Sequence, residues 1–124
     1  MKPLMRLAAV LEVVTGAALL VAPSAVTFWI LREDLSPGGT ALGRVTGFAL
    51  IALGLACWPS RETTPQTRSA WAMFTYSVLV AIYLGYYGVS QSAGALLWPA
   101  VVAHVVFAIL FVTAWSRDSH HVAA

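Results

Sequence analysis

The chain has 124 residues, of which 60% are hydrophobic and only 10% are charged. Soluble domains usually carry about a quarter charged residues, so this composition excludes an ordinary water-soluble protein. Seven Lys and Arg residues against five Asp and Glu residues give a net charge of +2. Because these cations are scattered and form no basic patch, a nucleic-acid-binding protein is also excluded.

Four apolar stretches follow one another at about residues 4–22, 40–58, 66–89 and 95–115. A helix needs about 20 predominantly apolar residues to cross the hydrocarbon core of a bilayer. Backbone polar groups in lipid must be satisfied within the segment, so each stretch is predicted to be helical. We therefore expect a single transmembrane domain over residues 1–124. Its fold class is all-α, an integral membrane four-helix bundle with up-down-up-down topology.

The N-terminal stretch also fits a secretory signal peptide, with Lys2 and Arg6 as its basic region. Ala22-Pro-Ser-Ala25 would then be a poor cleavage site. Glu12 in the middle of the apolar run, and the three spans that follow, favour a retained first helix.

The connections contain elements of their own. Residues 24–33 are apolar and aromatic but too few to cross, so we expect a short interfacial helix there, followed by a tight loop at Ser36-Pro37-Gly38-Gly39. Thr64 and Pro65 are predicted to cap and begin the third span. The polar tail after Trp115 is expected to be frayed.

The positions of Lys and Arg predict the orientation. The outer connections carry only Arg32, whereas the N-terminus, the second connection and the tail carry Lys2, Arg6, Arg61, Arg68 and Arg117. The positive-inside rule then places both termini in the cytoplasm, as a multi-pass protein of the bacterial inner (plasma) membrane. Tryptophans are expected at the two interfaces, the inner one with Trp58, Trp71 and Trp115 and the outer one with Trp29 and Trp98.

Small residues predict where the helices approach one another. The second span contains a G-x-x-x-G motif and a further glycine two turns later. The first span carries one such glycine, and the third carries an alanine and a glycine four residues apart. The predicted packing residues are Gly16, Gly43, Gly47, Gly54, Ala81 and Gly85. Such residues serve either packing within the bundle or a homodimer interface, and we favour the first.

Ionisable residues inside a membrane are costly and are functional candidates for that reason. Glu12 and His104 are both predicted near the midplane, and Tyr76 and Ser77 of the third span reach a similar depth. A carboxyl group beside an imidazole can share a proton, so these residues form the predicted polar intramembrane site. It would bind a small ligand or move protons, or else serve as a structural hydrogen bond that sets helix register.

Arg44 is the third ionisable residue of the spans, near the outer end of the second. An ion pair with Glu12 would cancel both charges, but the two Cα atoms differ in depth by roughly 10 Å. We instead expect Arg44 to reach the outer interface or Tyr83, with Glu33 or Asp34 available to neutralise it.

Catalytic and cofactor motifs are missing from the sequence. His104 is the only histidine in the spans, whereas a bis-histidine haem needs two; His120 and His121 lie in the tail, and Cys57 has no second cysteine as partner. The sequence shows no phosphate-binding glycine loop, nucleophile elbow or zinc motif. We therefore expect no catalytic residue, metal or cofactor.

The segments LEVVTGAALLVAP, GRVTGFALIALGLACWP and LLWPAVVAHVVFAILF together resemble the small four-span bacterial membrane proteins called DoxX-like. That resemblance implies a four-helix membrane bundle. Some relatives in that group are subunits of quinone-linked oxidoreductases, which implies an accessory role in a larger complex.

The chain is also similar, more weakly, to the small multidrug resistance transporters. These have four spans and an essential glutamate midway along the first, which corresponds to Glu12. The strong charge bias of the connections, the long first connection and Arg44 depart from that family.

These observations predict a non-catalytic accessory or assembly subunit of a membrane complex, with the lipid bilayer around it. Its protein partner would be a second copy of the chain or a larger membrane protein complex. The alternative is a proton-coupled small-molecule transporter that uses Glu12 and acts as an oligomer.

Overall fold

The computed structural model describes residues 2–59, 67–91 and 93–122. These residues are all-α and contain no strand, as predicted. The helices are α1 (Lys2–Val21), α2 (Pro23–Leu31), α3 (Pro37–Ala56), α4 (Thr67–Ser90) and α5 (Leu97–Val122). Thr64 and Pro65, the predicted start of the third span, lie outside the described residues.

The start of α3 corrects the predicted tight loop at Ser36-Pro37-Gly38-Gly39. The helix already begins at Pro37, because the Ser36 side chain caps it by accepting a hydrogen bond from the Gly39 amide at 3.1 Å. Proline at the first helical position loses no hydrogen bond, since that amide has no intrahelical partner.

The C-terminal end of α5 corrects the predicted frayed tail. The helix continues past Trp115 through Val122. The segment after Trp115 contains neither proline nor glycine, so no residue in it forces the helix to stop.

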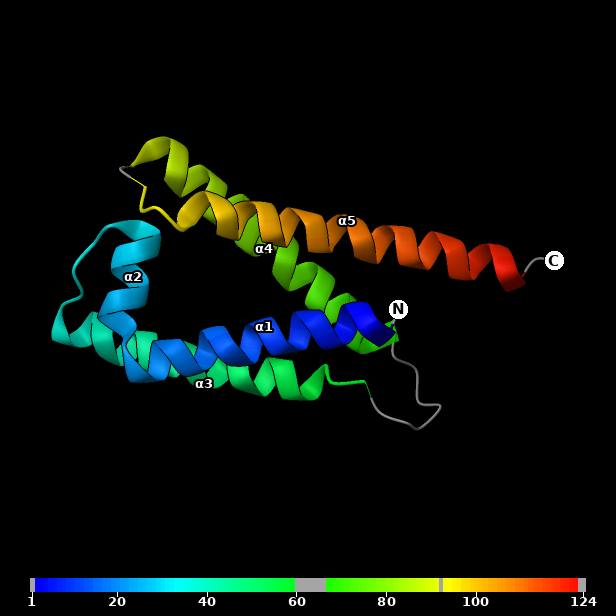
Figure 1. Ribbon diagram of the computed structural model, residues 1–124, viewed down its shortest axis with the longest axis horizontal. Helices are drawn as coiled ribbons and strands as arrows, with labels where there is room; N and C mark the ends of the chain where they lie inside the picture. Colours follow the sequence, from blue (N-terminus) through cyan, green and yellow to red (C-terminus); the bar gives the residue numbers. More distant parts are fainter. Residues whose placement is uncertain (1, 60–66, 92, 123–124) are drawn as a thin grey trace.

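The four long helices form two pairs (Figure 1). Helix α1 packs along α3, and α4 packs along α5, while α2 stands between the pairs. Successive long helices run in opposite directions. The N-terminus, the C-terminal end of α3 and the C-terminal end of α5 therefore lie at one end, called here the terminal end. Helix α2 and the connection before α5 lie at the other, called here the α2 end.

The α1–α3 pair is held by glycines at which the two backbones nearly touch. A Cβ atom built on Gly16 would lie 2.6 Å from the carbonyl oxygen of Gly47, and one on Gly47 would lie 2.7 Å from that of Gly16. A Cβ atom on Gly54 would similarly meet the carbonyl oxygen of Ala9 at 2.7 Å. Close approach of this kind lets backbone atoms make dispersion contacts along the whole crossing.

A hydrophobic core at the terminal end joins the two pairs. Its buried members come from α1, α4, α5 and the end of α3; they are Met5, Ala8, Cys57, Ala70, Met73, Phe107 and Phe111. Beside it, the Trp71 and Trp115 rings lie 4.4 Å apart between centroids. The Phe74 ring meets the Trp115 ring edge-on at 5.4 Å.

At the α2 end the link between the pairs is made of backbone. The carbonyl groups of Ile30 and Trp29, at the end of α2, accept hydrogen bonds from the amides of Gly94 and Leu96 at 3.0 and 2.9 Å. Helix ends leave such carbonyls without an intrahelical partner. The connection before α5 thereby ties α4 and α5 to α2.

Four of the helices are long and apolar enough to cross a membrane: α1, α3, most of α4 and the Leu97–Ser116 part of α5. Their outward surfaces are apolar as well, with large exposed side chains such as Leu42, Ile82 and Val89. The composition of these helices is that of a multi-pass membrane protein.

Candidate functional site

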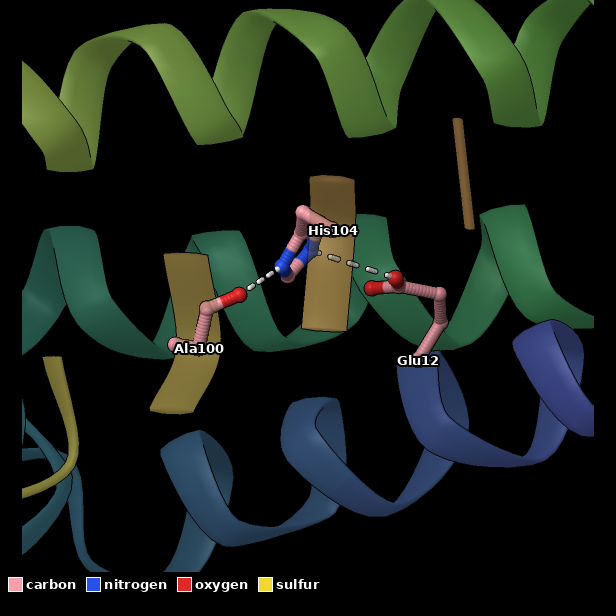
Figure 2. Close-up of polar contacts among 3 residues, drawn as sticks. All are labelled: Glu12, Ala100 and His104. Carbon is pink, nitrogen blue, oxygen red and sulfur yellow. Dashed lines mark hydrogen bonds and ion pairs between the residues drawn. The ribbon is translucent and has the colours of Figure 1, made fainter. Parts of the chain in front are cut away.

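Glu12 of α1 and His104 of α5 face each other between the two helix pairs (Figure 2). The Nε2 atom of His104 lies 3.9 Å from the Oε1 atom of Glu12, and both side chains are largely buried. This is an ion pair when the imidazole is protonated, although the distance is too long for a direct hydrogen bond.

The other imidazole nitrogen has a fixed role. Nδ1 of His104 lies 2.8 Å from the carbonyl oxygen of Ala100, one turn earlier in α5 (Figure 2). A carbonyl oxygen only accepts, so Nδ1 carries a hydrogen in this arrangement. Nε2, which has no hydrogen-bond partner among the described residues, is the ring nitrogen that faces Glu12.

Tyr76 of α4 completes this group. Its ring meets the His104 ring edge-on, with centroids 5.7 Å apart, and its hydroxyl group interacts with the Glu12 carboxyl group. Three side chains from three helices thus converge on one point. The predicted contact among Glu12, His104 and Tyr76 is present in the structure.

A cavity of about 520 Å³ lies directly beside this group and is lined by residues of all five helices. His104 and Tyr76 form part of its wall, together with aliphatic side chains such as Leu50, Val80 and Leu84. Its size falls within the range of roughly 300–1,000 Å³ typical of sites for small molecules. A bound molecule would therefore touch the imidazole and phenol rings directly, while Glu12 lies behind them.

The hydroxyl groups of the cavity wall differ in what they bond. Thr27 donates to the carbonyl oxygen of Pro23, and Thr46 to that of Leu42, both at 2.9 Å. Thr15 of α1 also lines the cavity, but its hydroxyl group makes no hydrogen bond within the part of the chain that the structure describes.

Other predicted site residues lie elsewhere. Ser77 is buried, with only 2% of its surface exposed, and makes no described contact with Glu12 or His104. Arg44 and Tyr83 are both exposed. Neither forms an ion pair or a side-chain hydrogen bond with any residue whose side chain the structure describes, in 2–59, 67–91 and 93–116. The Glu12–Arg44 ion pair that was weighed above is accordingly not formed.

The remaining predicted packing residues also differ in their surroundings. A Cβ atom on Gly43 would meet Pro23 of α2 at 3.0 Å, so this glycine accommodates α2. Gly85 of α4 has nothing within 4 Å of such an atom, and Ala81 is half-buried on the same helix.

Metal binding finds no support in the described residues. No group of three or more His, Cys, Asp or Glu side chains comes together there. The free Cys57 is buried, and its Sγ atom lies 3.6 Å from the carbonyl oxygen of Ser69.

No family model matches the chain, and neither a curated protein nor a solved structure does. The function must therefore be argued from the cavity and the residues around it.

Neither the cavity nor the position of Thr15 in its wall was predicted from the sequence. One signal was available, because Thr15 lies three residues after Glu12 and so falls near the same face of α1. The part of the cavity wall that α2 forms could not be predicted in this way, because every residue of its apolar sequence could equally face lipid.

Proposed function

We propose that this chain is a multi-pass membrane protein that binds a small molecule in the cavity between its helix pairs, with binding linked to a proton held by Glu12 and His104. The observation that carries the proposal is the position of His104. Its Nε2 atom lies beside a buried carboxyl group, and its ring forms part of the cavity wall. A change of charge on this pair would act on any molecule in the cavity at close range and low dielectric constant.

The membrane setting is part of the same proposal. The length and composition of the four long helices support a multi-pass protein of the inner membrane. Both termini would lie in the cytoplasm, because Lys2, Arg6 and Arg68 lie at the terminal end, whereas the described connections at the α2 end carry only Arg32. In this setting the protein is a proton-linked carrier or receptor, and no catalytic group is required.

The test uses purified protein in lipid nanodiscs and a photoreactive dodecanol that carries a diazirine. Labelling of cavity-lining peptides, measured by mass spectrometry over a pH series, should change roughly fivefold or more, as expected for a coupling energy of about 1 kcal/mol or above. Glu12→Gln should keep the labelling but remove its pH dependence. Glu33→Gln, which changes an exposed carboxyl group outside the helices, should behave like the parent protein. An equal pH dependence in Glu12→Gln would contradict the proton link.

A second candidate function, an accessory subunit of a homo-oligomer or larger membrane complex, is supported by Arg44. This exposed cation lies seven residues after Pro37, about 10 Å along α3, where an unpaired charge in lipid is costly. A carboxylate on a partner chain would remove that cost. Chemical crosslinking in native membranes should then capture a partner that Arg44→Gln loses and Arg32→Gln keeps. Identical crosslinking in both variants would count against this assembly.

A further inference from the structure

We infer that the cavity takes an uncharged, lipid-soluble molecule carrying at most one hydrogen-bond acceptor group, and that this molecule reaches the cavity sideways from the bilayer. The inference rests on the proposed function for the membrane setting and names the class of ligand. Three independent features of the cavity lead to it: where it opens, which charges line it, and which of its polar groups are unused.

The opening of the cavity reaches along the helices and is not confined to the α2 end. Several of its lining residues are exposed on the outer surface, among them Leu11, Thr46 and Pro99. Thr46 lies nine residues after the start of α3, about 13 Å along the helix, and Leu11 lies midway along α1. In a membrane these positions face hydrocarbon chains, so a molecule dissolved in lipid has the direct route.

The lining excludes a charged ligand. Among the described residues that form the wall there is no Asp, Glu, Lys or Arg, and the one ionisable ring nitrogen that could act, Nε2 of His104, faces Glu12. A charged group placed in such surroundings would lose its hydration without gaining a counter-charge, which costs several kcal/mol or more.

The hydrogen-bond donors of the cavity wall are almost all engaged within the protein. The Thr27 and Thr46 hydroxyl groups donate to carbonyl groups of their own helices, and the Tyr76 hydroxyl group interacts with Glu12. The Thr15 hydroxyl group is the exception among the described lining side chains. A second hollow, of about 470 Å³, shares Thr15, Val26 and Ile30 with the cavity. This hydroxyl group can therefore bond one polar atom of a ligand.

The experiment compares three probes of equal chain length on the protein in nanodiscs: diazirine-bearing dodecane, dodecanol and dodecyltrimethylammonium. The two neutral probes should label cavity-lining peptides saturably, and the cation at least about tenfold less. Ala103→Phe, which fills the cavity, should remove the neutral labelling, whereas Val102→Phe on the exposed neighbouring position should not. Thr15→Val should weaken dodecanol labelling about threefold, the value of one hydrogen bond, without affecting dodecane.

Three results would overturn the inference: cation labelling equal to that of the neutral probes, labelling that unlabelled dodecanol does not compete away, or an equal effect of Ala103→Phe and Val102→Phe. The competition uses the parent protein, so it holds even if a variant does not fold. Failure here is distinct from failure of the proton link. If the neutral probes label saturably but without pH dependence, only the proton link is contradicted. If only the cation labels the cavity, and does so in a pH-dependent way, only this inference is contradicted.

Discussion

At the scale of single residues, Glu12 and His104 are the ionisable side chains buried between the two helix pairs. A carboxyl group within an apolar helix is tolerated when partners share its charge or proton. The structure supplies two partners from other helices, the His104 imidazole and the Tyr76 hydroxyl group. The Ala100 carbonyl group further determines which imidazole nitrogen meets Glu12, because it holds a hydrogen on Nδ1.

The tautomer of His104 is directly testable by ¹⁵N NMR on protein carrying His120→Gln and His121→Gln, in which His104 is the only histidine. We expect neutral His104 to be protonated on Nδ1 and unprotonated on Nε2. Glu12→Gln should shift the Nε2 resonance and leave Nδ1 nearly unchanged, since only Nε2 faces residue 12. A neutral form protonated on Nε2 would contradict the assigned geometry.

At the scale of helices, the α1–α3 crossing depends on glycines that allow backbone contact. A side chain at Gly16 or at Gly47 would collide with the backbone of the other helix. Gly85 of α4 looks the same in sequence, but nothing lies within 4 Å of the position where its Cβ atom would be. The same residue type is therefore indispensable at one crossing and replaceable on another helix.

Gly16→Ala should destabilise the fold by about 1–3 kcal/mol, because the added methyl group must push two backbones apart. Gly85→Ala is the matched control and should be neutral or stabilising by up to about 1 kcal/mol, given the higher helix propensity of alanine. Thermal unfolding of the two variants in the same detergent measures the difference. Equal melting temperatures would show that the α1–α3 contact is not as close as described.

At the scale of the whole molecule, two helix pairs are joined by a hydrophobic core at one end and by backbone hydrogen bonds through α2 at the other. The cavity lies between these two junctions, where the pairs do not close on each other. Alternating helix directions place Lys2 and Arg68 at one end and Glu33 near the other (Figure 1). This arrangement makes the orientation in the membrane testable.

Single cysteines introduced as Lys2→Cys and Glu33→Cys, in a chain carrying Cys57→Ala, should differ in their reaction with a membrane-impermeant maleimide. We expect Glu33→Cys to react in intact cells and Lys2→Cys only after the membrane is permeabilised, because cations are retained on the cytoplasmic side. The reverse pattern would invert the proposed orientation. Equal reaction of both in intact cells would contradict a crossing of the membrane by α1, the one candidate span between the two positions.

The sequence alone was sufficient for the class of fold and for the helices, because span length and apolar content are local properties that a stretch such as Leu7 to Ala22 carries by itself. It also singled out Glu12, His104 and Tyr76, since depth along antiparallel helices follows from residue counting. Helix ends were less predictable, as Ser36 and Pro37 show: the same residues suit a turn and a cap.

Only the tertiary structure decided where the cavity lies, that Thr15 faces it, and that Ser77 at nearly the depth of Tyr76 is buried away from it. These outcomes depend on the rotation of each helix about its axis and on the distance between helices. In a chain whose helices are apolar on nearly every side, hydrophobic periodicity specifies neither quantity, so packing between the helices decides both.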